Sequence, residues 1–167
     1  KIIKSSEIIF LEGYLWDEGE PKKAFEKAIN NAKKVAMSLS DLFCVERHKQ
    51  NFLDLVKRKL DLTFANENEI MALINTKNFD EVITFAKEIK KHIIITRGEK
   101  GAISISGDEI IEIKANKNLA IKDLTGAGDL FAAGYLHGLI NNLSTEKCLG
   151  QATELSSKVI QQIGARL

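Results

Sequence analysis

The sequence predicts an α/β fold with a mostly parallel sheet, a β-hairpin and two closing helices. Short apolar segments rich in β-branched residues alternate with longer segments whose apolar residues recur at helical spacing. Strands that are separated by helices pair in parallel through right-handed crossovers. The strands are nearly continuous in apolar residues, which is typical of a sheet covered by helices on both faces.

The first part of the chain is expected to supply three strands and the helices between them. Residues 7–12 (EIIFLE) form a short apolar run that predicts a buried strand. Pro21 then starts a helix, at a position where the missing N–H has no consequence. Further strands are expected at residues 35–39 and 60–65, with a helix over residues 46–59 between them.

The middle of the chain continues the alternation and then changes pattern. Helices are expected at residues 67–74 and 79–89, followed by the clearest strand, His92–Thr96 (HIIIT). Residues 101–114 predict a hairpin, because two strand-like runs flank a short turn that contains a glycine.

The last part is expected to be mainly helical. Residues 118–122 predict one more strand, and residues 127–141 and 145–162 predict two helices. Gly164 is expected to mark the stop of the last helix.

Composition and charge exclude several classes of partner. The 167 residues suit one domain, and the formal net charge of +1 gives no reason to expect nucleic acid or an acidic membrane surface. No apolar run approaches the length of a membrane span. Cys44 and Cys148 form no metal-binding or disulfide pattern, so a cytoplasmic location is expected.

The segment Thr125-Gly126-Ala127-Gly128-Asp129 opens a predicted helix. The first turn of a helix offers unpaired N–H groups and a positive dipole end, and glycines let a ligand approach the backbone. These features favour a phosphate site. Asp129 would repel a phosphate, but a carboxylate there makes sense as the base for an attacking hydroxyl. The alternative is a tight turn in which Asp129 only complements the helix dipole, and a short Gly-x-Gly does not decide between them.

Two other segments follow predicted strands. The loop from Thr96 to Gly101 (TRGEKG) is either a backbone loop beside a nucleotide or an ordinary strand-to-hairpin turn. Asn66 and Glu69 either form a capping box at a helix start or organise water around Mg²⁺.

Together these three segments resemble the PfkB-type carbohydrate kinases, the ribokinase family. Asp123–Asp129 (DLTGAGD) is similar to the family signature D-[TS]-T-G-A-G-D, with Leu124 in place of the usual Thr or Ser. The family's T-x-G-x-x-G loop matches Thr96, Gly98 and Gly101, and its N-x-x-E motif matches Asn66 and Glu69. All three motifs follow strands and occur in the same order as in the family. Residues 38–70 also resemble the adenosine-kinase-like and related sugar-kinase branch. The resemblance implies a ribokinase-like three-layer α/β sandwich.

The resemblance also implies an activity, which is ATP-dependent phosphoryl transfer to a hydroxyl of a sugar or nucleoside. Asp129 would be the catalytic base, and the N–H groups of Gly126, Ala127 and Gly128 would form an anion hole. ATP would be bound by six residues: Thr96, Gly98, Gly101, Thr125, Thr153 and Ser157. Asn66 and Glu69 would hold Mg²⁺ through water. Some family members bind a monovalent cation such as K⁺ near the position of Asp123.

The resemblance covers the later part of a family member. Residues 1–167 are therefore expected to be the C-terminal, nucleotide-binding part of a single kinase domain, without the acceptor-binding part and its lid. Alone they are expected not to phosphorylate an acceptor, and a homodimer would form through the lid. A second hypothesis is a non-catalytic nucleotide- or metabolite-binding module, and a third is a scaffold domain. Asp129 favours the kinase, because binding alone does not need an acid that faces phosphate.

Overall fold

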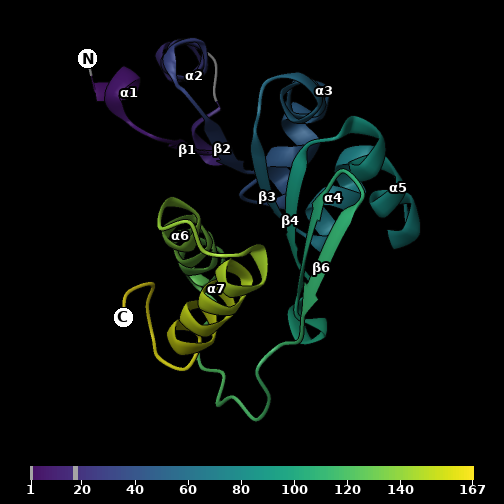
Figure 1. Ribbon diagram of the computed structural model, residues 1–167, viewed down its shortest axis with the longest axis vertical. Coiled ribbons are helices and arrows are strands. Elements are labelled where there is room, and N and C mark those ends of the chain that lie inside the picture. Colours follow the sequence, from purple (N-terminus) through teal and green to yellow (C-terminus); the bar gives the residue numbers. More distant parts are fainter. Residues whose placement is uncertain (1, 17–18) are drawn as a thin grey trace. The chain divides into compact units, whose positions relative to one another are not determined.

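The computed structural model describes residues 2–16 and 19–167. Within these residues six strands are hydrogen-bonded in chain order: β1 (Ile9–Glu12), β2 (Val35–Ser38), β3 (Leu62–Asn66), β4 (His92–Thr96), β5 (Ala102–Ser106) and β6 (Glu109–Ile113) (Figure 1). β1 pairs in parallel with β2, and β2 pairs in parallel with β3. The predicted α/β class with a mostly parallel sheet is therefore confirmed.

The chain forms two compact units. One contains Lys1–Ile95 together with Ile105–Glu109, and the other contains Thr96–Ser104 together with Ile110–Leu167. Each unit is built from segments that are not contiguous in sequence, because the boundary crosses the β5–β6 hairpin.

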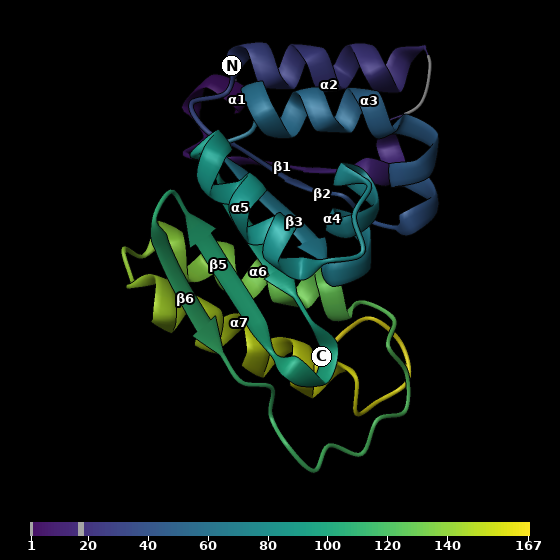
Figure 2. The same ribbon diagram turned by 90° about the vertical axis from the view of Figure 1, so that its right-hand side faces the viewer.

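The first unit contains the parallel strands and their connecting helices. Its elements are α1 (Ile2–Ser5), β1 (Ile9–Glu12), the 3₁₀ helix η1 (Gly13–Leu15), α2 (Glu20–Asn31), β2 (Val35–Ser38), α3 (Leu42–Arg58), β3 (Leu62–Asn66), α4 (Glu67–Ile74), α5 (Phe79–Ile89) and β4 (His92–Thr96), whose last residue belongs to the second unit. The helices α2 and α3 lie side by side (Figure 2). Between them Trp16 is buried, with its ring edge-to-face against Phe25 and Phe52.

Hydrogen bonds at the two ends of α3 explain two differences from the predicted bounds in this unit. The helix expected from residue 46 begins at Leu42, because the Asp41 carboxylate accepts a hydrogen bond of 3.1 Å from the Phe43 N–H. The strand expected from residue 60 begins at Leu62, because the Leu60 N–H still bonds to the Leu55 carbonyl at the end of α3. The bounds of α4, α5 and β4 agree with the prediction.

The second unit contains a hairpin strand pair and two long helices. Its elements are the 3₁₀ helix η2 (Gly98–Lys100), β5 (Ala102–Ser106), β6 (Glu109–Ile113), α6 (Ala127–Ile140) and α7 (Thr145–Val159), except that Ile105–Glu109, the hairpin turn with the adjoining strand ends, belongs to the first unit. Figure 1 shows α6 and α7 side by side. Phe131 and Tyr135 of α6 and Leu149 and Ala152 of α7 are buried. The predicted hairpin and both closing helices are confirmed.

Two predictions near the C-terminal helices are wrong. Residues 118–122 form no strand: Asn118 has a φ of +58°, and the N–H groups of Lys122 and Asp123 both bond to the Ile160 carbonyl. These bonds draw the backbone toward the end of α7 instead of into a sheet. The last helix ends at Val159 and not at residue 162, so Gly164 lies beyond its end.

Both cysteines, Cys44 and Cys148, are buried and free. Within residues 2–16 and 19–167, no helix is both long enough and apolar enough to cross a membrane.

Candidate functional site

A cavity of about 830 Å³ lies within the second unit. This volume is in the range of about 300–1,000 Å³ that small-molecule sites occupy. Its walls come from the end of β4 with η2, the connection from β6 to α6, the first turns of α6 and the second half of α7. Seven of the predicted site residues line it: Thr96, Gly98, Gly101, Ala127, Gly128, Thr153 and Ser157.

The turn that opens α6 requires a glycine at its start. Gly126 precedes the helix with a φ of +79°, and a Cβ atom there would lie 2.7 Å from the Cβ of Ala165. Its carbonyl accepts the first helical hydrogen bond, of 2.9 Å, from the Leu130 N–H. Gly126 therefore sets the direction of the helix, and its left-handed conformation is one that other residues adopt only with strain.

Gly128 has a different role, because its backbone is open. A Cβ atom at this position would meet nothing within 4 Å, and the residue lines the cavity. The Ala127 N–H, by contrast, donates to the Leu124 carbonyl at 3.2 Å, inside the turn. Of the three predicted anion-hole residues, Gly128 thus presents the most accessible backbone. Such a helix start favours an anion through its N–H groups and dipole.

Asp129 is the third residue of α6, and its side chain is exposed. Within the described part of the chain, its carboxylate has no hydrogen-bonding or ion-pair partner. Its position in the first helical turn suits the dipole-complementing role, and its exposure leaves the carboxylate available to accept a proton. The two alternatives for Asp129 therefore remain compatible with this geometry.

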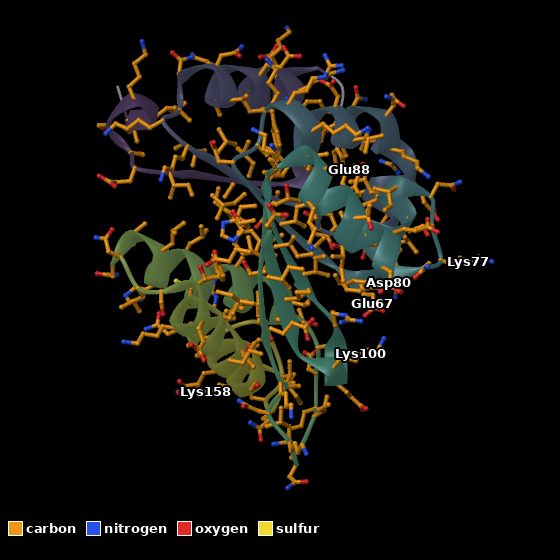
Figure 3. The ribbon with its side chains drawn as sticks, turned by 45° about the vertical axis from the view of Figure 1, so that its right-hand side comes forward. Glu67, Lys77, Asp80, Glu88, Lys100 and Lys158 are labelled. Atoms are coloured by element: carbon orange, nitrogen blue, oxygen red, sulfur yellow. The ribbon has the colours of Figure 1, made fainter. Side chains whose placement is uncertain are left out.

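The two glycines of the loop after β4 differ from each other. Gly101 has a φ of +101°, and a Cβ atom there would lie 1.9 Å from the Ile113 carbonyl oxygen. Gly98 has a φ of +56°, and a Cβ atom there would meet open space at the cavity wall. Lys100 projects from the same turn (Figure 3) and also lines the cavity. The loop is thus both a tight strand-to-hairpin turn and a wall of the cavity.

We expect Gly101→Ala to lower the free energy of unfolding more than Gly98→Ala does. The alanine at residue 101 would combine a strained φ, which costs about 1–3 kcal/mol, with a backbone clash. Alanine at residue 98 meets only the milder left-handed penalty of about 1–2 kcal/mol. Urea unfolding of both variants measures the difference, and equal destabilisation would contradict the assignment of Gly101 as the structural glycine.

Asn66 and Glu69 lie in the first unit, where β3 ends and α4 begins, and they form a reciprocal capping box. The Asn66 side-chain oxygen accepts from the Glu69 N–H at 2.9 Å. The Glu69 carboxylate accepts from the Asn66 N–H at 2.9 Å and from the Asn66 side-chain amide at 2.6 Å. The capping alternative is confirmed, and the Mg²⁺ role stays a prediction.

Glu69 is a buried carboxylate, with 5% of its surface exposed. Burial raises its pKa above the ordinary value, the hydrogen bond from the Asn66 N–H opposes this shift, and the negative charge of Asp41 adds to it. The negative charge of Asp41 adds to the negative potential at Glu69, and such a potential favours a nearby cation.

Two predicted site residues do not line the cavity but bond to each other. The Asp123 carboxylate accepts from the Thr125 N–H at 2.9 Å and from the Thr125 hydroxyl at 2.7 Å. These two bonds, and a third from the Gly164 N–H at 2.9 Å, lower the pKa of Asp123. Asp123 and Thr125 thus form part of the support for the turn that opens α6.

The connection from β6 to α6 is the part of the site that sequence reasoning missed. Residues 114–119 line the cavity, and the Asn116 amide donates to the Ser157 hydroxyl at 3.1 Å. The available signal was the polar run Lys-Ala-Asn-Lys-Asn at residues 114–118, which is typical of a loop. Thr153 also lines the cavity, and its hydroxyl oxygen is buried with no hydrogen-bonding partner among the described residues.

Comparison with known proteins identifies the family. The chain matches the model of the pfkB family of carbohydrate kinases over residues 1–167. The chain belongs to the pfkB carbohydrate kinase family. The interpretation that was made from the signature at Asp123–Asp129 is thereby confirmed at the level of the family.

The individual relatives agree with this assignment. The chain is 36% identical to the adenosine kinase of Sinorhizobium meliloti, with a TM-score of 0.95 over 99% of this chain and 52% of that one. It is 31% identical to a nucleoside kinase of Methanocaldococcus jannaschii over 71% of this chain and 38% of that protein. A protein described as ribokinase II from E. coli, solved with ATP and Mg²⁺, shares the fold with a TM-score of 0.87 at 19% identity, over 98% of this chain and 55% of that one.

These matches confirm the ribokinase-like fold. The chain spans 38% to 55% of the length of these three relatives, or about half of the two solved structures.

Proposed function

We propose that this chain supplies the nucleotide-binding part and the catalytic base of an ATP-dependent kinase that phosphorylates a hydroxyl of a sugar or nucleoside. The observation that carries the proposal is the open backbone of Gly128 on the cavity, at the start of a 14-residue helix and directly before an exposed carboxylate, Asp129. The protein described as ribokinase II from E. coli, which shares this fold, was solved with ATP and Mg²⁺. Relatives named as nucleoside and adenosine kinases support this class of acceptor.

The residues around the cavity fit a nucleotide. The apolar side chains Leu119, Ile121, Phe131 and Ile160 line it together with hydroxyl and amide groups. An apolar wall with a few polar groups suits a base and ribose, since stacking and burial need the first and orientation needs the second. The anionic phosphates would meet the start of α6, where the helix dipole and the open N–H groups favour negative charge.

The proposed chemistry assigns separate roles to neighbouring residues of α6. ATP supplies the phosphoryl group when it is bound. Asp129 accepts the proton of the acceptor hydroxyl as the acceptor oxygen bonds to phosphorus and the bond from phosphorus to the leaving ADP oxygen breaks. The backbone N–H group of Gly128 stabilises the negative charge on the transferred group, and Gly126, which does not line the cavity, sets the direction of the helix.

The test uses the protein at its natural length with ATP, Mg²⁺ and a panel of sugars and nucleosides. We expect ATP binding in calorimetry and ADP release that depends on one class of acceptor. ATP binding without transfer to any acceptor would favour the alternative, a non-catalytic nucleotide-binding module. Absence of ATP binding would contradict both.

We infer that Asn66 and Glu69 order water molecules around Mg²⁺. Each oxygen of the Glu69 carboxylate accepts one bond from Asn66, and a carboxylate oxygen can accept a second. The buried charge of Glu69, with the charge of Asp41 adding to the negative potential, favours a hydrated cation. One lone pair on each Glu69 oxygen is used by the capping box. The remaining lone pairs can accept hydrogen bonds from water molecules that are bound to the metal.

Glu69→Gln is expected to raise the Mg²⁺ concentration needed for half-maximal rate by about tenfold, the effect typical of an outer-shell partner of a metal. Glu67→Gln, in the same first turn of α4, is the matched control and should leave the Mg²⁺ dependence unchanged. The pKa of Glu69 is raised in the folded protein, so protonated Glu69 stabilises the fold relative to the unfolded chain. This contribution to the free energy of unfolding is lost as the pH rises from the ordinary glutamate pKa of about 4.3 through the raised value. The glutamine variant should lack this component of the pH dependence. A lower Tm with unchanged Mg²⁺ dependence would show that Glu69 acts only as a cap.

A further inference from the structure

The segment after α7, Ile160–Ala165, is fastened to the chain that leads into α6, and we call it the C-terminal strap. The Ile160 carbonyl accepts hydrogen bonds of 2.8 Å from the Lys122 N–H and 3.3 Å from the Asp123 N–H. Four residues later, the Gly164 N–H donates to one oxygen of the Asp123 carboxylate at 2.9 Å. The strap is thus bonded to Asp123 through both its backbone and its side chain.

The other oxygen of Asp123 holds the turn before α6. It accepts from the N–H of Thr125 at 2.9 Å and from the hydroxyl of Thr125 at 2.7 Å. One carboxylate therefore joins the strap to the residue directly before Gly126. Hydrogen bonds to a charged acceptor are about twice as strong as neutral ones, so this joint is stronger than a backbone turn alone.

A steric contact adds to these bonds. A Cβ atom at Gly126 would lie 2.7 Å from the Cβ and 2.9 Å from the Cα of Ala165, so the strap lies directly against the turn. Gly126 sets the direction of α6, and the open backbone of Gly128 follows two residues later. Any movement of the strap would therefore change the position of the proposed anion site.

The arrangement at Asp123 does not fit the monovalent cation that the family resemblance implies. Three hydrogen-bond donors, two from Thr125 and one from Gly164, direct their protons at this carboxylate. A hard cation needs converging oxygen atoms, and protons at the same position would repel it. These three donors already stabilise the charge of Asp123.

We propose that Asp123 is a positioning residue, which holds the anion-binding turn by fastening it to the C-terminal strap with hydrogen bonds that make a monovalent cation unnecessary. The inference rests on the proposed function, because the turn is taken to bind the phosphates of ATP. It goes further by proposing that the C-terminal strap holds that turn in place. Of the strap residues, only Ile160 lines the cavity.

The test compares Asp123→Asn with Asp108→Asn, an exposed aspartate in the β5–β6 turn, in the protein at its natural length. Asparagine keeps the size of the side chain but has only one acceptor oxygen for three donors. We expect Asp123→Asn to weaken ATP binding in calorimetry by about tenfold or more, the effect of losing one charge-assisted hydrogen bond. Asp108→Asn should bind ATP like the parent.

A second pair of variants keeps the test valid if Asp123→Asn does not fold. Thr125→Val removes one of the three donors and should weaken ATP binding less, and Thr125→Ser should restore it. Unchanged ATP affinity in folded Asp123→Asn and Thr125→Val would overturn the inference. If the parent itself does not bind ATP, the proposed function fails, and this outcome is distinct from a parent that binds and variants that bind equally well.

The role of a cation is tested separately. The ATP affinity of the parent should be the same in K⁺ as in tetramethylammonium at constant ionic strength. An affinity that rises about tenfold with K⁺ in the parent, but not in Asp123→Asn, would show that Asp123 is a cation ligand and would overturn the inference.

Discussion

Asp129→Asn is expected to lower kcat by about 10²–10⁴-fold, the range that a general base contributes. Asparagine keeps the shape and polarity of the side chain but cannot accept the proton of the acceptor hydroxyl. ATP binding should be kept or slightly tightened, because one negative charge near the phosphates is removed. Calorimetry with ATP and a coupled assay of ADP release, on the protein at its natural length, measure the two effects separately.

The structural alternative for Asp129 gives a different result. If its carboxylate only complements the dipole of α6, the variant should lose about 0.3–1 kcal/mol of stability and keep its kcat. The exposed side chain has no partner in the described structure, so its replacement should not disturb the packing of α6. A variant that phosphorylates at close to the parent rate would contradict the assignment of Asp129 as the base.

Features that depend on neighbouring residues in the chain could be predicted from the sequence. The capping box of Asn66 and Glu69 uses side chains three residues apart, and the predicted and observed bounds of α4 agree. The strand His92–Thr96 is a continuous apolar run whose central residues are all buried. In both cases the signal and the structure that it specifies lie within one short segment.

Features that depend on distant contacts could not be predicted. The connection over residues 114–124 is positioned by bonds from Asn116 to Ser157 and from Lys122 and Asp123 to Ile160. These partners lie about forty residues further along the chain, so local pattern favoured a strand that does not form. The C-terminal strap could not be predicted either, because no residue near Gly164 in the sequence indicates that its N–H bonds to Asp123.

The roles of individual glycines within one motif also depend on distant contacts and could not be predicted from the sequence. Gly98 and Gly101 look equivalent in the sequence, but only Gly101 is pressed against the Ile113 carbonyl. Gly126 and Gly128 also look alike, but Gly126 is pressed against Ala165 while Gly128 faces open space. A motif therefore indicates which glycines belong to a site, and tertiary contacts decide which of them serve the fold and which serve the ligand.

Gly128→Val should abolish most of the turnover while the fold survives, and this prediction follows from the open space at Gly128. The added side chain would occupy the region where the phosphates approach the backbone, and loss of one such donor typically costs about 10²–10³-fold in kcat. Gly128→Ala should have a smaller effect of the same kind. ATP affinity and kcat for the two variants should fall in the order of side-chain size.

Stability should change in the opposite direction for Gly128→Ala. Because a Cβ atom meets nothing there, alanine in the first turn of α6 should raise the free energy of unfolding by up to about 0.5–1 kcal/mol. Gly150→Ala is the matched control: it lies inside α7, its Cβ would meet only the Ile113 side chain at an ordinary 3.8 Å, and it does not line the cavity. That variant should gain stability and keep ATP binding. A Gly128→Ala protein that is more stable but binds ATP more weakly is the result expected for an anion site at Gly128, whereas unchanged turnover in Gly128→Val would contradict the anion-hole assignment.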